Sequence, residues 1–259
     1  MPDTPFYETD KAVYEYLLFH YGSSEEILPY PNGPVSALHY PVRCVIECFD
    51  SGLLPSGARA LDLGCAVGRS SFELARICGS VVGIDYSHRF IEAANELKEK
   101  GILPYLRTDE GDLTTALEAR VPEGIDGSRV SFQQADATQL PTDLGTFDAV
   151  LAANLIDRLD NPRAFLDDLP GLMNPGGQLV ITSPYTWLEE YTPKENWLGG
   201  FEKAGARRRT VDGLEEVLSP HFVKVREIDL PFLIREHARK FQWSVAHGTI
   251  WIRKGVGEG

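Results

Sequence analysis

The sequence lacks the features by which membrane-spanning, exported and metal-binding proteins are usually recognised. None of its apolar runs approaches the roughly 18 residues of a membrane helix, and its polar N-terminus carries no secretory signal. The four cysteines form no CxxC pair and no two histidines stand at zinc-finger spacing, so no metal site is expected. These absences predict a cytoplasmic protein that does not partner a membrane.

Basic residues are outnumbered by acidic ones. The 259 residues include 25 lysines and arginines against 38 aspartates and glutamates, which gives a formal net charge of −13. Nucleic acids and anionic membranes are therefore disfavoured as main partners. The one basic cluster, at 207–209, is diluted by neighbouring glutamates and is expected to be a solvated surface.

What the sequence does contain is an alternation of apolar runs with helical patterns. Each apolar run is expected to be a strand. These strands should end at Leu63, Asp85, Asp136, Asn154 and Tyr185. Helices are expected over 87–100 and 161–173, the second kinked or broken near Pro170. Continuous apolar runs are typical of parallel strands covered on both faces. The pattern predicts an α/β fold with a doubly wound, mostly parallel sheet and a ligand at the carboxyl ends of its strands.

Three segments lie outside this alternation. Before the sheet, we expect a helix over 11–21, capped by Asp10 and ended by Gly22, and a second helix over 42–50. Residues 101–128 fit no strand–helix unit and are expected to be an insertion, while 222–254 should form a hairpin that adds an antiparallel edge. The prediction is one domain, with a helical cap (1–57), a cofactor-binding core (58–183) and a substrate loop with C-terminal strands (184–259).

The turn after the first expected strand, Gly64-Cys65-Ala66-Val67-Gly68, is the strongest local signal. Glycine lets a backbone approach a ligand closely, and the helix that follows offers unpaired N–H groups. A phosphate-binding loop is excluded because Arg69 and Ser70 follow Gly68 where a lysine is needed. The dinucleotide pattern GxGxxG fails because Ala66 and Arg69 occupy two of its three glycine positions. The ligand type that remains for this turn is a compact nucleoside with an amino-acid tail.

The stretch ALDLGCAVGRSSFELA resembles motif I of the class I S-adenosylmethionine-dependent methyltransferases, [DE]-x-G-x-G-x-G, and departs from it at Ala66. The resemblance implies S-adenosylmethionine as cofactor and a seven-stranded Rossmann-like sheet with an antiparallel C-terminal strand. It also implies that the cofactor lies over the turn, formed by Asp62, Gly64, Cys65, Ala66 and Gly68.

The ends of the later strands continue the resemblance. Asp85, with Tyr86 beside it, matches the acidic position that accepts both ribose hydroxyls, for which a carboxylate with two oxygens is well suited. Asp136 and Ala137 match the pair beside adenine, and Asn154 matches the position facing the methionine part and the methyl group. The matching pattern spans about residues 58–183.

The flanks FYETDKAVYEYLLFHYG, LPYPNGP, ALHYPVRCV and SPYTWLEEYTPKENWLGGF resemble the methyltransferases of ovothiol biosynthesis. That resemblance implies N-methylation of an imidazole nitrogen of 5-thiohistidine (4-mercaptohistidine), in the standalone form rather than as a domain of a sulfoxide synthase. Methylation of another small amino acid, amine or carboxylate stays open, as does a catalytically silent cofactor-binding module that regulates a partner. A dehydrogenase is a distant further alternative.

Methyl transfer is an in-line displacement, so the protein mainly has to position its reactants, and an imidazole with a free pKa near 6.5 makes a strong general base optional. The candidate catalytic residues are Asn154, Asp157, Tyr185 and Trp187. The candidate residues for binding the small-molecule substrate are Tyr7, Tyr14, Phe19, Tyr21, Arg43, Tyr185, Trp187, Trp197 and Arg235.

Overall fold

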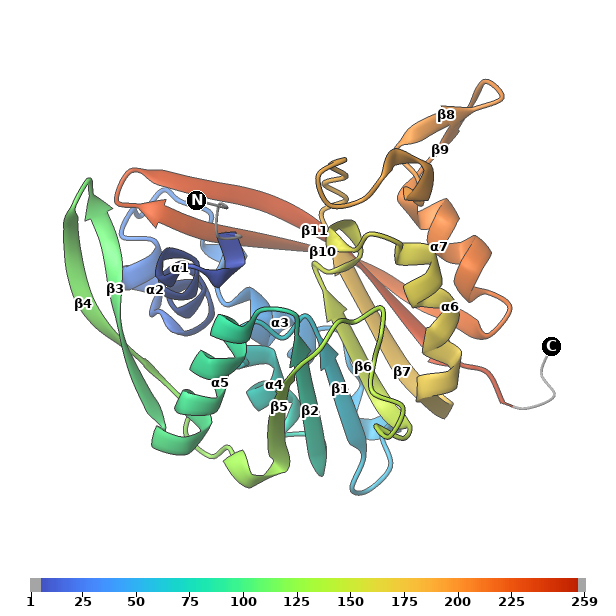
Figure 1. The fold of residues 1–259 in the computed structure, drawn as a ribbon, viewed down its shortest axis with the longest axis horizontal. Helices are drawn as coiled ribbons and strands as arrows, with labels where there is room; N and C mark the ends of the chain where they lie inside the picture. Colours follow the sequence, from blue (N-terminus) through green and yellow to red (C-terminus); the bar gives the residue numbers. More distant parts are fainter. Residues whose placement is uncertain (1–5, 256–259) are drawn as a thin grey trace.

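The computed structural model describes residues 6–255, which form one seven-stranded sheet with helices on both faces (Figure 1). The strand order is β10-β11-β7-β6-β1-β2-β5. The bounds are β1 Arg59–Leu63, β2 Ser80–Asp85, β5 Val130–Gln134, β6 Phe147–Ala153, β7 Met173–Ser183, β10 Phe222–His237 and β11 Lys240–Arg253. Strands β5, β2, β1, β6 and β7 run parallel, which confirms the predicted doubly wound architecture.

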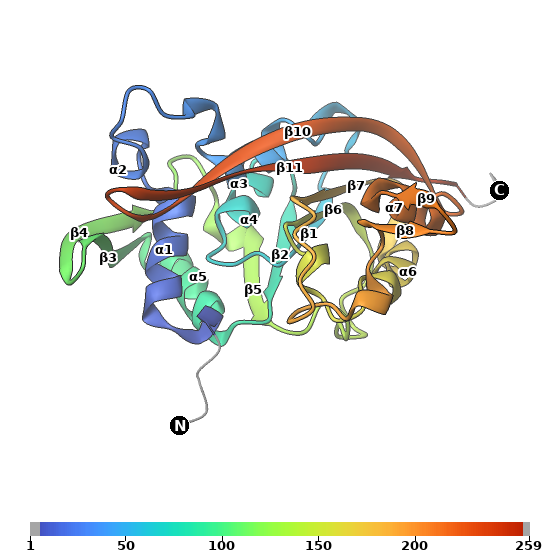
Figure 2. The ribbon, with the colours of Figure 1, turned by 90° about the horizontal axis from the view of Figure 1, so that it is seen from above.

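The expected C-terminal hairpin, formed by β10 and β11, is present and adds an antiparallel edge to the sheet. β11 is antiparallel to both of its neighbours, β7 and β10, and lies between them. β10, which precedes β11 in the chain, therefore forms the edge. The two strands are long, and Figure 2 shows them running past the sheet towards α1, β3 and β4.

Two hydrophobic clusters hold the helices on opposite faces of the sheet. One contains Leu17 of α1, Phe72 of α4 and Leu97 of α5, together with side chains of α3. The other contains Phe165 of α6 and Leu214 of α7. The helix bounds are α1 Asp10–Tyr21, α3 Tyr40–Ile46, α4 Arg69–Leu74, α5 His88–Lys100, α6 Pro162–Leu172 and α7 Thr210–Leu218. No helix within 6–255 combines the length and apolarity that crossing a membrane requires.

The cap differs in detail from the prediction. Thr9, not Asp10, caps α1, because its side chain accepts a hydrogen bond from the N–H of Ala12 at 3.2 Å. α3 begins two residues earlier than expected, where His39 adopts a left-handed φ of 56°, and it ends at Ile46 instead of 50. A short helix, α2 (Ser24–Ile27), was not predicted; its signal was the capping box of Ser23 and Glu26.

The expected insertion is a separate hairpin. β3 (Ile102–Glu110) pairs with β4 (Leu113–Arg120) in a two-stranded sheet of its own that packs on α1 and α5. A second small hairpin, β8 (Phe201–Lys203) and β9 (Ala206–Arg208), was not predicted and carries part of the basic cluster. Arg207 and Arg209 are exposed there, as expected for a solvated surface.

Pro170 does not break α6. The helix continues to Leu172 and passes directly into β7 at Met173. The proline removes one intrahelical hydrogen bond, and only two residues of helix follow it.

Candidate active site

The carboxyl ends of β1, β2, β6 and β7 meet at one edge of the sheet, and hydrogen bonds join the residues that follow them. The N–H groups of Gly64 and Cys65 both donate to the carbonyl of Ile84, at 2.8 and 3.0 Å. The N–H of Asn154 donates to the carbonyl of Thr182 at 2.8 Å. The predicted strand ends therefore lie side by side.

The first turn is built from left-handed residues. Gly64, Ala66 and Gly68 have φ angles of 74°, 46° and 85°. A Cβ on Gly68 would lie 2.5 Å from Cζ of Phe132, so this position requires glycine. Alanine adopts the same region at Ala66 at a cost of roughly 1–2 kcal/mol. The hydroxyl of Tyr21 donates to the carbonyl of Val67 at 2.8 Å and fixes the turn from α1.

Asp62 is buried under this turn with one oxygen unpaired. Its Oδ2 accepts hydrogen bonds from the hydroxyls of Ser70 and Ser71 at 2.7 and 2.6 Å. Its Oδ1 has no hydrogen-bond partner among the described residues. Burial raises the pKa of Asp62 to about 6, since it disfavours the charged form. An orphaned, buried acceptor next to a left-handed turn fits the ammonium group of S-adenosylmethionine.

Asp85 is oriented by the backbone. Its Oδ2 accepts from the N–H of Ala66 and its Oδ1 from the N–H of Ser87, both at 2.9 Å. Each oxygen keeps further acceptor capacity, which suits a pair of ribose hydroxyls. Burial raises the pKa of Asp85 to about 6. The adjacent Tyr86 is 71% exposed, so its ring does not form a closed wall.

A tight turn follows β5, the strand that was expected to end at Asp136. Oδ1 of Asp136 accepts from the N–H and the hydroxyl of Thr138, at 2.8 and 2.7 Å. Asp136 and Ala137 are both half-buried at this point. Cys65, in the first turn, is buried, and its backbone N–H and carbonyl are bonded to Ile84 and Gly68.

Asn154 is held in a left-handed conformation, with φ of 52°. Its Oδ1 accepts from the hydroxyl of Tyr40 at 2.8 Å, and that hydroxyl lies 2.6 Å from Oγ1 of Thr182. The amide NH₂ of Asn154 has no hydrogen bond to another described side chain, and so remains a donor for a ligand. Tyr40 was missed from the sequence, although it lies in the aromatic flank ALHYPVRCV.

The cap brings aromatic rings to the same edge. The hydroxyl of Ser87 donates to the carbonyl of Tyr7 at 2.8 Å, which holds the 3-10 turn Phe6–Glu8 over the end of β2. Phe19 stacks on Tyr40 with ring centroids 6.0 Å apart. These contacts place Tyr7, Phe19 and Tyr21 beside the strand ends. Tyr14 instead packs half-buried against the core.

Trp187 and Trp197 do not line the site, contrary to the prediction. Their rings stack on each other with centroids 6.2 Å apart, and Trp187 is only 9% exposed. The indole N–H of Trp187 donates to the hydroxyl of Thr210, and the indole N–H of Trp197 donates to the carbonyl of Thr192. Because both donors are bonded inside the protein, the pair forms the core of the loop after β7.

Asp157 is also structural and not free for catalysis. Its Oδ1 accepts from the hydroxyl of Ser183 at 2.9 Å, and its Oδ2 accepts from the N–H of Thr186 and from Arg158, both at 3.1 Å. Burial raises the pKa of Asp157, and these bonds oppose that rise. The carboxylate thus fixes the path of the chain beyond β7.

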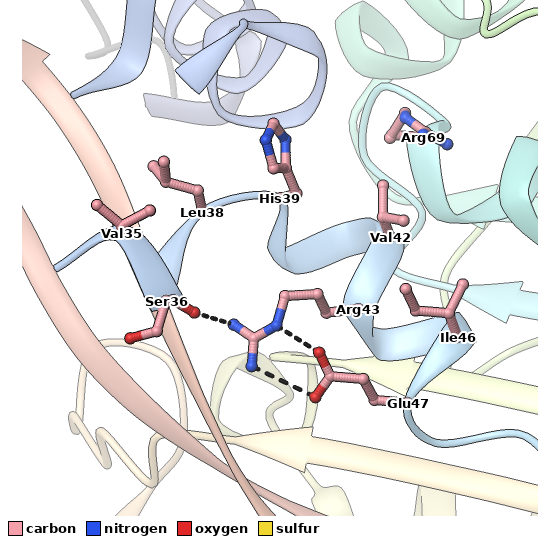
Figure 3. A pocket seen from close by; sticks show the side chains of 9 residues that line it. All are labelled: Val35, Ser36, Leu38, His39, Val42, Arg43, Ile46, Glu47 and Arg69. Carbon is pink, nitrogen blue, oxygen red and sulfur yellow. Dashed lines mark hydrogen bonds and ion pairs between the residues drawn. The ribbon is translucent and has the colours of Figure 1, made fainter. Parts of the chain in front are cut away.

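Arg43 and Arg235 lie away from the strand ends, which corrects their predicted role in substrate binding. Figure 3 shows Arg43 beside a hollow of about 630 Å³ on the outer side of α3, with its guanidinium bonded to Glu47 and to the carbonyl of Ser36. Arg235 is buried at the far end of β10, where it donates to the carbonyl of Glu26 and pairs with Asp109 of β3. Arg43 also donates to the carbonyl of Pro231 in β10, so both arginines join the helical cap to β10.

Tyr185 does lie at the predicted edge, two residues beyond the end of β7. It has a left-handed φ of 56°, and its hydroxyl is 2.7 Å from Nδ1 of His247. No sequence spacing indicated His247, because it comes 62 residues later in the chain.

Residues 61–181 match the family model described as "Methyltransferase domain". The chain is 29% identical over 153 residues to the ubiquinone biosynthesis O-methyltransferase of Xanthomonas axonopodis pv. citri (strain 306), covering 59% of this chain and 53% of that protein. It is 33% identical over 126 residues to the demethylmenaquinone methyltransferase of Clavibacter sepedonicus, covering 49% of this chain and 41% of that protein. The chain thus spans about half the length of the curated relatives it matches.

Among solved structures, a SAM-dependent methyltransferase from Methanosarcina mazei superimposes with a TM-score of 0.52 at 17% identity, covering 78% of this chain and 95% of that one. This likeness supports the fold. The family match assigns a methyltransferase domain to residues 61–181.

Proposed function

We propose that the protein methylates a ring nitrogen of a small amino acid, and that 5-thiohistidine is its acceptor. The observation that carries the proposal is Arg158, a cation fixed at the carboxyl end of β6 where a carboxylate can meet it. The aromatic flanks that resemble the methyltransferases of ovothiol biosynthesis support the choice of acceptor.

Arg158 is anchored to the chain around it mainly through one nitrogen, Nη1. Its Nη1 donates to the carbonyl and Oδ2 of Asp157 and to the carbonyl of Thr186, at 2.9, 3.1 and 3.2 Å. The guanidinium lies over the ring of Tyr191 at 4.7 Å, and Tyr7 interacts with it from the cap. Its side chain is 29% exposed. A planar guanidinium anchored in this way can offer its other N–H groups to a carboxylate, which it would bind as a fork.

Three residues would hold the cofactor: Asp62 its ammonium, Asp85 its ribose hydroxyls and Asn154 its methionine part. When bound, S-adenosylmethionine supplies an electrophilic methyl group on a sulfonium, which departs as a neutral thioether when the acceptor takes the methyl. The chain orients the reactants for this in-line step and encloses them between the cap and the strand ends. Aromatic faces such as Tyr7 and Tyr16 suit a cationic sulfonium and a flat imidazole ring.

A second candidate is O- or C-methylation of a quinone precursor, which the names of the two curated relatives favour. The role of Arg158 separates the two candidates. An amino-acid acceptor needs a cation for its carboxylate, whereas an uncharged phenol does not.

The test is transfer of labelled methyl from S-adenosylmethionine to 5-thiohistidine, histidine and a catechol under identical conditions. We expect labelled 5-thiohistidine, and an at least tenfold higher KM with Arg158→Gln while cofactor affinity is kept. Arg163→Gln is the matched control, because Arg163 pairs with Glu216 on the surface of α6 and α7. Labelling of the catechol alone, or an Arg158→Gln enzyme with unchanged KM, would refute the proposal.

A further inference from the structure

Three side chains line up beyond the end of β7, and two of them have no role in the site described above. The hydroxyl of Tyr185 lies 2.7 Å from Nδ1 of His247, and Nε2 of that imidazole lies 3.4 Å from Oε2 of Glu227. The register of the sheet produces this line, because His247 of β11 pairs with Ser183 of β7 and Glu227 of β10 pairs with Thr249 of β11.

The geometry of Tyr185 is imposed by its surroundings. Its left-handed φ of 56° costs a residue with a Cβ roughly 1–2 kcal/mol. Its N–H donates to the hydroxyl of Ser183, which in turn donates to the buried Asp157. Its ring meets the imidazole of His247 edge-on, with centroids 5.7 Å apart. The strained backbone of Tyr185 therefore orients its phenol hydroxyl towards His247.

The hydrogen-bond roles follow from the chemistry of the three groups. When the phenol of Tyr185 donates to Nδ1 of a neutral His247, the imidazole proton sits on Nε2, facing Glu227. A hydrogen bond from Lys224 lowers the pKa of Glu227, which keeps its carboxylate charged. Burial raises the pKa of Tyr185, which keeps the phenol protonated at rest.

Other charges face the same three groups. Asp229 stands opposite His247 on β10, and Lys224 also contacts Glu215 of α7. Asp157 and Arg209 act on Tyr185 with opposite signs. An imidazolium on His247 therefore has two carboxylates near it, on Glu227 and Asp229, and no arginine or lysine in direct contact among the described ion pairs.

We propose that Tyr185, His247 and Glu227 form a proton relay that takes the proton a neutral acceptor loses on methylation. The relay rests on the proposed function. As an N–H or O–H of the acceptor gives its proton to the oxygen of Tyr185, the phenol proton passes to Nδ1 of His247. The bonding pair stays on the acceptor, whose charge is unchanged by gaining a methyl group and losing a proton. The positive charge that the sulfonium loses is carried by His247, next to Glu227.

The relay makes a prediction about which atom is methylated. A thiolate has no proton to lose and gains nothing from the relay. A neutral imidazole attacks through its unprotonated nitrogen and loses the proton of its other ring nitrogen, and a phenol loses its O–H proton, so both gain from the relay. On an acceptor that carries both groups, the relay directs the methyl group to nitrogen instead of sulfur.

A first experiment needs no turnover. Nitrogen-15 NMR of the histidines, with the His247 signals assigned through His247→Asn, reports which ring nitrogen carries the proton. We expect the Nε2–H tautomer at neutral pH and a shifted Nδ1 signal in Tyr185→Phe. A His247 protonated on Nδ1 overturns the relay, whichever acceptor the protein uses.

A second experiment measures catalysis in Tyr185→Phe and His247→Asn, with cofactor affinity measured by calorimetry. We expect a fall in kcat of about 100-fold or more and unchanged cofactor affinity. Tyr30→Phe is the control, because Tyr30 also loses a hydroxyl hydrogen bond, to the carbonyl of Ala238 at the hairpin tip. A full rate in either variant overturns the relay. A wild type that methylates no acceptor overturns the proposed function instead, and the tautomer then decides the relay alone.

Discussion

Replacing Asp85 by alanine should weaken the binding of S-adenosylmethionine by about 100-fold. The two carboxylate oxygens are aimed by the N–H groups of Ala66 and Ser87 and would each accept one ribose hydroxyl. Hydrogen bonds to a charged group contribute about 1.5–3 kcal/mol each. We take the lower end for both, because the free carboxylate already keeps part of its solvation, and expect a loss of about 3 kcal/mol.

The same carboxylate predicts a pH dependence. Burial raises the pKa of Asp85 to about 6, so the free protein takes up a proton there as the pH falls. A protonated carboxyl group accepts less well, and we therefore expect affinity to fall below about pH 6 in the wild type. Asp85→Ala, which has no carboxyl group at this position, should lose that part of the dependence.

Isothermal titration calorimetry at pH 8 and pH 5 measures both effects. Asp126→Ala is a matched control, because Oδ1 of Asp126 also accepts from the N–H two residues ahead, that of Ser128, but far from the strand ends. Circular dichroism shows whether each variant is folded. A folded Asp85→Ala protein that binds within threefold of the wild type would mean that the ribose is held elsewhere, and the reasoning would be refuted.

Three further predictions concern stability. Gly68→Ala should cost about 2–4 kcal/mol in urea denaturation, because its Cβ would meet Phe132, whereas Gly111→Ala, with open space around it, should cost about 1. Trp187→Phe should lower the melting temperature and leave the acceptor KM unchanged; a raised KM would return this indole to the substrate site. Because the pKa of Asp62 is raised from its usual value near 3.8 to about 6, its contribution to stability should be lost as pH rises from about 4 to about 6, and Asp62→Asn should flatten that change.

The strand ends could be predicted because the signal there is local. Continuous apolar runs mark buried parallel strands, and a polar residue directly after each run must lie at the carboxyl edge. Asp85 and Asn154 were found in this way, and the structure places them at the ends of β2 and β6, on either side of β1 and its glycine turn. Their roles towards the cofactor remain predictions.

Side-chain direction could not be predicted, because a loop has no periodicity. Trp187 and Tyr185 are two residues apart after β7, yet one is buried against Thr210 and the other reaches His247. Long-range partners were equally hidden. Tyr40 meets Asn154 across 114 residues, and only the register of the folded sheet brings such pairs together.

The position of β11 has a consequence for assembly. β11 comes last in chain order among the seven strands, yet it occupies an interior place between β7 and β10. Until it is in place, β10 has no sheet partner and β7 is an open edge, each with a row of unsatisfied backbone groups. Because β10 and β11 form one hairpin, the pair can dock on β7 as a unit through β11, and until it docks both β7 and β11 are open edges exposed to aggregation.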